Sequence, residues 1–194
     1  MVALIFLDCD GVLHPLGENH HPIGSDLDDV LSRVDEQLAP ENENRRSFVT
    51  RTVAQEFLPA HLEQLRRIVV ATGAEIALTT TWRLQGSDRR AVLQHLQASG
   101  CLPCSAACDV QRGECVEHRV GVTKSLNRDG RGAEIADYLR RNGHDQREAN
   151  YVILDDDHET VLDGGHINAE RFVALDKSTA LTEDAADRAI AILL

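Results

Sequence analysis

The sequence predicts an α/β protein built on a doubly wound parallel sheet. Four apolar runs, at residues 3–7, 75–78, 151–154 and 171–175, lack the polar–apolar alternation of half-exposed strands. Helical patterns separate these runs, and such a β-α-β order is typical of parallel sheets. Each run also ends in polar residues, which a parallel sheet gathers at one edge. We therefore expect a three-layer, Rossmann-like arrangement.

The segments between the strands carry helix start and stop signals. Apolar residues recur at helical spacing, and Ser, Thr, Pro, Gly and Asn stand where caps are expected. These terminal residues are Pro59 and Gly73 for the first helix, Ser87 and Gly100 for the second, Asn142-Gly143 at the end of the third, and Thr182 at the start of the last.

A single domain is expected over residues 1–194, because this length suits one hydrophobic core. Residues 16–57 differ from the rest by being polar and acidic, and we expect them to form a small cap-like insertion after the first strand. One helix is expected within it, over 26–38, with Ser25 as N-cap and Asp28 in its first turn.

The charge and hydropathy of the chain limit the classes of partner that it is expected to bind. The chain has 20 Lys and Arg against 32 Asp and Glu, a net charge of −12. This balance does not support binding to nucleic acid. No apolar run approaches the ~20 residues that span a bilayer, so no membrane partner and a cytoplasmic location are expected. The oligomeric state is not predicted.

Asp8 and Asp10 follow the first apolar run directly. Residues i and i+2 of a strand point to the same side, so both carboxylates can face one reacting group, and Gly11 allows a sharp turn. Neighbouring carboxylates repel unless one is protonated or a cation lies between them. Hard oxygen ligands favour Mg²⁺. A solvated strand end is the simpler alternative.

Four segments resemble the ordered motifs of the haloacid dehalogenase (HAD) superfamily of phosphotransferases. They are "FLDCDGVLHP", "EIALTTTWR", "RGAEIADYL" and "YVILDDD", and together they cover most of residues 3–157. Their details are similar to a bacterial subgroup related to the HAD domains of some RNA-repair (Swiss Army Knife) proteins. The substrates of that subgroup are largely undefined.

The resemblance implies a Mg²⁺-dependent phosphatase. Asp8 would be the nucleophile that forms an aspartyl-phosphate, and Asp10 the general acid and then the base. Asp8, the backbone carbonyl of Asp10, and Asp155 or Asp156 would hold the metal ion. The substrate would be a phosphomonoester, either a small ester or a phosphorylated polynucleotide end.

For two positions of the phosphate-binding site, the sequence leaves two candidate residues each. Thr79 or Thr80 would donate its hydroxyl to the phosphoryl group, and Thr80 is preferred. The third motif usually carries Lys; here the match falls on Arg131, which is favoured, while Lys124 lies seven residues earlier. Either cation would stabilise charge on the phosphate.

Three further residues near these motifs have both a structural and a substrate-binding interpretation. Arg83 could contact substrate, brace the acidic cluster or form an ordinary salt bridge. Trp82 is expected to pack, although it could line the mouth of the pocket. His14 is expected to be structural, although it could touch the substrate.

Two other functions compete with the phosphatase. One is a non-catalytic or regulatory domain that keeps the phosphate and metal site; a response-regulator receiver would lack a partner such as Asp10. The other is a zinc-stabilised module using Cys101, Cys104, Cys108 and Cys115, with His118 nearby. Only one C-x2-C pair occurs, so reduced thiols are the preferred interpretation.

Overall fold

The computed structural model describes residues 2–16, 57–84, 86–102, 120–124 and 130–194, without the side chains of 86–88. One sheet has the strand order β3-β2-β1-β4-β5, and all its pairs are parallel. The strands are β1 (Leu4–Leu7), β2 (Glu75–Leu78), β3 (Gly121–Val122), β4 (Tyr151–Asp155) and β5 (Phe172–Ala174). The four strands predicted from the apolar runs are confirmed. β3 was missed because two residues are too few to form a recognisable run.

The sheet is doubly wound about β1. From this central strand the chain adds β2 and β3 on one side, then returns to add β4 and β5 on the other. The strand order thus reverses next to β1, at the place where open α/β sheets form their binding crevices. The predicted fold class is confirmed.

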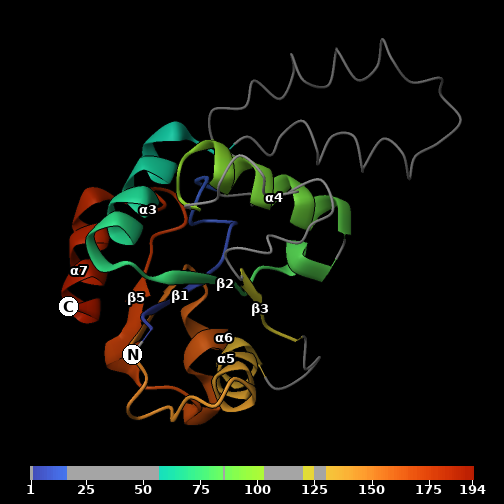
Figure 1. Cartoon of the computed structure of the whole chain (residues 1–194), viewed down its shortest axis with the longest axis vertical. Coiled ribbons are helices and arrows are strands. Elements are labelled where there is room, and N and C mark those ends of the chain that lie inside the picture. Colours follow the sequence, from blue (N-terminus) through green and yellow to red (C-terminus); the bar gives the residue numbers. More distant parts are fainter. Residues whose placement is uncertain (1, 17–56, 85, 103–119, 125–129) are drawn as a thin grey trace, which may run out of the picture.

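Helices cover both faces of the sheet (Figure 1). They are α3 (Pro59–Thr72), α4 (Gly86–Ala98), α5 (Gly130–Arg141), α6 (His158–Leu162) and α7 (Glu183–Leu193). One buried cluster joins the sheet to α3, α4 and α7, and a second joins its opposite face to α5 and α6. This gives the three expected layers, with an apolar core on each side; the core facing α5 and α6 includes the rings of Phe6, Tyr151 and Phe172.

Most of the predicted helix ends are found. Gly73 ends α3 in the left-handed conformation, with φ 65°. Thr182 caps α7, and its hydroxyl oxygen accepts a hydrogen bond from the backbone N–H of Ala185 at 3.3 Å. The prediction for Ser87 is wrong: α4 begins at Gly86, so Ser87 lies inside the helix and not at its N-cap. The helix expected over 26–38 lies outside the described residues.

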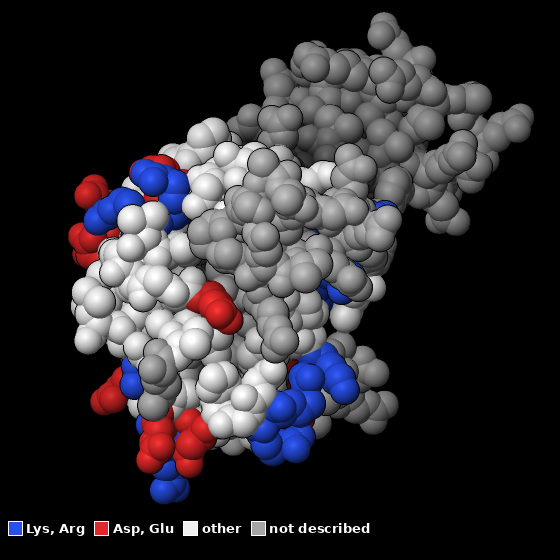
Figure 2. Space-filling model, in the orientation of Figure 1, with Lys and Arg blue, Asp and Glu red and all other residues white. Residues whose placement is uncertain are grey.

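Helices α3 and α7 pack against each other, and charged side chains join their exposed edges. Arg67 donates to Asp187 at 2.6 Å and lies 3.7 Å from Glu183. Figure 2 shows acidic and basic side chains side by side at this edge. Such exposed pairs contribute only about 0–1 kcal/mol each, so the apolar cores supply most of the stability.

Among the described residues, no helix combines the length and apolarity that crossing a bilayer requires.

Candidate active site

The register of the sheet brings three polar side chains to one level. Leu7 lies opposite Leu78 of β2 and Leu154 of β4. The residues that follow, Asp8, Thr79 and Asp155, are therefore neighbours at the carboxyl edge. The backbone continues the ladder there, since the Asp8 N–H donates to Leu154 at 3.1 Å and the Thr79 N–H donates to Leu7 at 2.9 Å.

These three side chains also share a face of the sheet. Side chains alternate along a strand, and Phe6, Ala77 and Ile153 belong to the buried cluster that faces α5 and α6. Asp8, Thr79 and Asp155 each lie two residues further on, so they extend that face. Cys9 lies on the opposite side and is fully buried in the other cluster.

Asp8, Asp155 and Asp156 form a compact acidic cluster. Each offers a carboxylate oxygen, and these oxygens all lie within 4.8 Å of one another. Gly11 makes room for the third carboxylate: its φ is +68°, and a Cβ placed on it would lie 2.5 Å from the Cγ of Asp156. A glycine at this turn therefore permits Asp156 to approach the first strand.

Arg131 is the cation that contacts this cluster. It lies in the first turn of α5, and its Nη1 is 2.5 Å from Oδ2 of Asp155 and 3.1 Å from Oδ2 of Asp8. Lys124, the alternative cation, is exposed beyond β3 and has no ion pair with the acidic cluster among the described residues. Of the two candidate cations, Arg131 is the one that contacts the acidic cluster among the described residues.

The cluster holds more negative charge than Arg131 can balance. Burial raises the pKa of Asp8, and the nearby Asp10 raises it further, although Arg131 opposes both effects. Burial and the charge of Asp8 raise the pKa of Asp155 to about 7 and that of Asp156 to about 6. Burial lowers the pKa of Arg131, but Asp8 and Asp155 outweigh it and raise the pKa overall. Three carboxylate oxygens with unbalanced charge fit a divalent cation.

The two candidate threonines differ in direction. Thr79 lines a cavity beside the cluster, and its hydroxyl is buried with no hydrogen-bond partner among the described residues. Thr80 belongs to the opposite face, where its hydroxyl oxygen accepts from the backbone N–H of Trp82 at 3.4 Å. A buried hydroxyl without a partner is uncommon, so that of Thr79 is available to a ligand.

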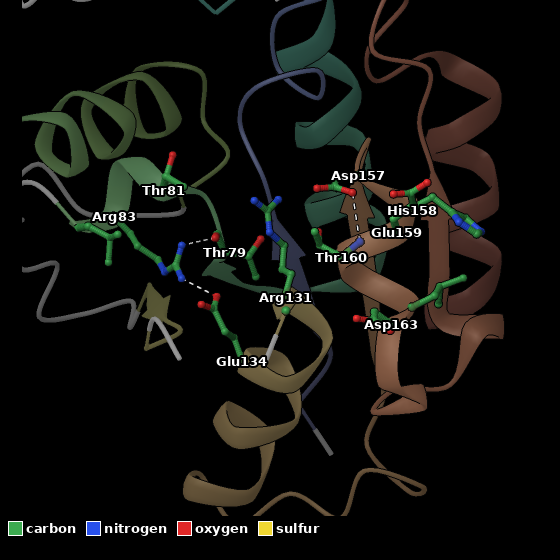
Figure 3. Close-up of a pocket in the computed structure, with 13 residues that line it drawn as sticks. Thr79, Thr81, Arg83, Arg131, Glu134, Asp157, His158, Glu159, Thr160 and Asp163 are labelled. Carbon is green, nitrogen blue, oxygen red and sulfur yellow. Dashed lines mark hydrogen bonds and ion pairs between the residues drawn. The ribbon is translucent and has the colours of Figure 1, made fainter. Parts of the chain in front are cut away.

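Arg83 braces the end of β2. Its guanidinium donates to the carbonyls of Thr79 and Thr80, and its Nε donates to the carbonyl of Thr123 at 2.9 Å. Its Nη2 lies 2.5 Å from Glu134 of α5 (Figure 3). Burial lowers the pKa of Arg83, and Glu134 opposes that shift. Arg83 therefore joins the end of β2 to the helix that carries Arg131. Of the roles weighed from the sequence, its ion pair with Glu134 corresponds to the ordinary salt bridge.

Asp10 has two aromatic neighbours whose contacts the sequence did not reveal. The indole N–H of Trp82 donates to its Oδ2 at 2.9 Å, and Nε2 of His14 lies 3.0 Å from its Oδ1. The distance between Nε2 of His14 and Oδ1 of Asp10 is within the range of an ion pair, but the contact lacks the geometry of a hydrogen bond. The sequence predicts a packing role for Trp82 and a structural role for His14. The only signal for their role was their position inside the first and second motifs.

A cavity of about 810 Å³ opens beside these groups. Thr79 and Arg83 line it from the end of β2, Arg131 and Glu134 line it from α5, and residues 157–160 close it at the start of α6 (Figure 3). In this view Arg131 points into the centre of the cavity, between Thr79 and Thr160. A group bound there would meet the same guanidinium that contacts Asp8.

The cysteine cluster lies largely outside the described residues. Of the four candidate zinc ligands only Cys101 is described. It is buried, and its thiol donates to the carbonyl of Leu62 at 3.4 Å. The zinc hypothesis therefore stays a hypothesis.

A family model described as "HAD domain in Swiss Army Knife RNA repair proteins" matches residues 4–186. This range contains the whole acidic cluster together with Thr79 and Arg131. No curated protein and no solved structure matches the chain at a significant level.

Proposed function

Because the chain belongs to the family of HAD domains found in Swiss Army Knife RNA repair proteins, and is in general terms a HAD-type phosphohydrolase, we propose a specific reaction for it. The protein is a Mg²⁺-dependent phosphatase that hydrolyses a phosphomonoester through an aspartyl-phosphate on Asp8. The observation that carries this proposal is the convergence of Asp8, Asp155, Asp156 and Arg131 at one edge of the sheet.

Asp8 is the nucleophile. It directly follows the central strand, and its carboxylate lies 3.1 Å from Arg131, which lines the cavity. A carboxylate oxygen of Asp8 attacks the phosphorus, and the bond from phosphorus to the leaving oxygen breaks. Water then attacks the same phosphorus and releases Asp8. Covalent catalysis replaces one difficult step by two easier ones.

Asp10 handles the protons of both steps. It gives a proton to the leaving oxygen in the first step and takes one from water in the second, a role that typically contributes ~10²–10⁴-fold. Its side chain keeps 39% of its surface exposed, so it is accessible to substrate, whereas Asp8 is almost fully buried. The burial of Asp8 suits a nucleophile held in a fixed position, and the exposure of Asp10 suits an acid that reaches the leaving group.

The metal site consists of Asp8, the backbone carbonyl of Asp10, and Asp155 with Asp156. The Oδ1 of Asp155 also accepts the backbone N–H of Asp157 at 2.9 Å, which fixes the orientation of that carboxylate. A bound Mg²⁺ would offset the charge of these carboxylates and allow a phosphate dianion to approach. Hard oxygen donors of this kind fit Mg²⁺.

Thr79 and Arg131 bind the phosphoryl oxygens. The buried hydroxyl of Thr79 has no other partner among the described residues, and Arg131 supplies a planar set of donors. We assign the hydroxyl role to Thr79 and not to Thr80, because the side chain of Thr80 belongs to the opposite face of the sheet.

A phosphorylated polynucleotide end is the second candidate substrate, supported by the description of the family. The net charge of −12 weighs against it, because a polyanion is repelled by an acidic surface. A panel of small phosphate esters and of 5′- and 3′-phosphorylated oligonucleotides, compared by kcat/KM at fixed salt, separates the two candidates.

Metal removal tests the proposed reaction directly. We expect EDTA to silence phosphate release from p-nitrophenyl phosphate, because unbalanced negative charge at Asp8, Asp155 and Asp156 then repels the dianion. Added Mg²⁺ is expected to restore the rate. The measurement is initial rate against free Mg²⁺ after dialysis. Full activity in EDTA would refute the metal-dependent reaction.

A pair of isosteric substitutions tests the threonine assignment. Thr79→Val is expected to lower kcat/KM by about 10–10²-fold, as for loss of one donor to developing charge. Thr80→Val is expected to remain within about threefold of the wild type, because the hydroxyl of Thr80 faces Trp82. Steady-state kinetics with p-nitrophenyl phosphate measures both. The reverse order of effects would return the role to Thr80.

A further inference from the structure

We propose that Trp82 is a positioning residue for acid catalysis, holding the Asp10 carboxylate in the orientation from which it protonates the leaving group. This inference rests on the proposed function and adds a residue to it. Trp82 is the only tryptophan in the chain, and its indole N–H donates to Oδ2 of Asp10 at 2.9 Å.

The contact restricts an otherwise mobile side chain. Asp10 is partly exposed and follows the end of β1, so packing alone does not fix its χ angles. Trp82 holds one carboxylate oxygen and His14 lies 3.0 Å from the other. Each carboxylate oxygen has two lone pairs, so the group can still carry and deliver a proton while it accepts from the indole.

The indole is itself held rigidly. Trp82 is 4% exposed, and its ring stacks on Phe57 with centroids 5.5 Å apart and planes 20° apart. Phe57 stacks in turn on His14, with centroids 5.9 Å apart. Trp82 also lies in the short 3₁₀ turn Thr81–Leu84 that Arg83 anchors to the sheet. The donor that reaches Asp10 is thus fixed by both packing and backbone.

The role has a chemical signature that a purely structural role lacks. The proton from Asp10 matters most when the leaving group is a strong base. p-Nitrophenolate leaves without a proton, whereas phenolate, with a pKa of about 10 like that of tyrosine, benefits from protonation as its bond to phosphorus breaks. A misplaced Asp10 side chain should therefore lower kcat/KM for phenyl phosphate more than kcat/KM for p-nitrophenyl phosphate.

The experiment compares Trp82→Phe with the wild type on both esters, in Mg²⁺. Phe retains a stacking ring and removes the N–H donor. We expect kcat/KM for phenyl phosphate to fall about tenfold or more, and kcat/KM for p-nitrophenyl phosphate to fall less than about threefold. The retained activity on the second ester shows that the variant is folded. Equal losses on both esters, including loss of all activity, would overturn the inference.

Two further variants make the test specific. Phe57→Leu loosens the packing that holds the indole but keeps the N–H donor to Asp10, so kcat/KM for phenyl phosphate should fall more than kcat/KM for p-nitrophenyl phosphate, and by less than in Trp82→Phe. In an Asp10→Asn background, Trp82→Phe should have no additional effect, because it acts through Asp10. A selective loss that persists in that background would contradict the proposed route. If the wild type hydrolyses neither ester nor the other phosphates of the panel, the proposed function fails, and with it this inference.

Discussion

Replacing Asp8 with Asn is expected to lower phosphate release by more than about 10³-fold, because an amide cannot form the aspartyl-phosphate. The substitution keeps the shape of the side chain. Burial already raises the pKa of Asp8, which means that the fold disfavours its charge. The variant should therefore fold, and its thermal unfolding, followed by circular dichroism, should show that the lost activity is chemical. Release of inorganic phosphate from p-nitrophenyl phosphate is the activity measurement.

Asp187→Asn is the matched control for that variant. It makes the same change in charge on the exposed face of α7, where Asp187 pairs with Arg67. Because exposed pairs contribute about 0–1 kcal/mol, the control should keep both the fold and the activity. Turnover by Asp8→Asn at the rate of this control would reject Asp8 as the nucleophile.

Replacing Gly11 with Ala is expected to disrupt the metal site. The added Cβ would lie 2.5 Å from Cγ and 2.6 Å from Oδ2 of Asp156, and the backbone would keep a positive φ that non-glycine residues avoid. Either Asp156 leaves the acidic cluster or the turn after β1 moves. Both outcomes should weaken the Mg²⁺ binding that we propose for this cluster. Activity titrated against Mg²⁺ should show a midpoint raised by tenfold or more, together with a lower plateau.

Gly73→Ala controls for backbone strain alone. Its φ of +65° is close to the +68° of Gly11, but a Cβ there would have no atom within 4 Å. Its cost is the left-handed conformation itself, about 1–2 kcal/mol. Gly73→Ala should therefore unfold at a lower temperature yet titrate with Mg²⁺ as the wild type does. An unchanged Mg²⁺ midpoint in Gly11→Ala would argue against Asp156 as a ligand.

Strands β1, β2, β4 and β5 were predictable from the sequence because most of their residues are buried and each reads as an unbroken apolar run. Because these runs do not alternate, the sequence does not show to which face of the sheet each residue at a strand end points. A run without alternation does not reveal which residues face which layer, so Thr79 and Thr80 could not be distinguished. The register of β2 against β1, together with the burial of Ala77 beneath α5, supplied the missing information.

The contacts around Asp10 could not be predicted for a different reason. Trp82 lies 72 residues from Asp10 along the chain, and their contact depends on the turn that follows β2. Glu134 likewise meets Arg83 across 51 residues. Spacing within a strand or a helix predicts local faces, whereas pairings between loops follow only from the completed topology.

Asp8 directly follows β1, a strand that is hydrogen-bonded on both sides, and Ile5, Phe6 and Leu7 of that strand are completely inaccessible to solvent. Segments of this kind open only when the whole domain unfolds. The carboxylate that we propose as the nucleophile therefore follows a segment whose amide protons should exchange only through global unfolding. Its placement is retained or lost together with the cooperative unit, so moderate losses of stability should reduce the folded fraction and leave the turnover of each remaining native molecule intact.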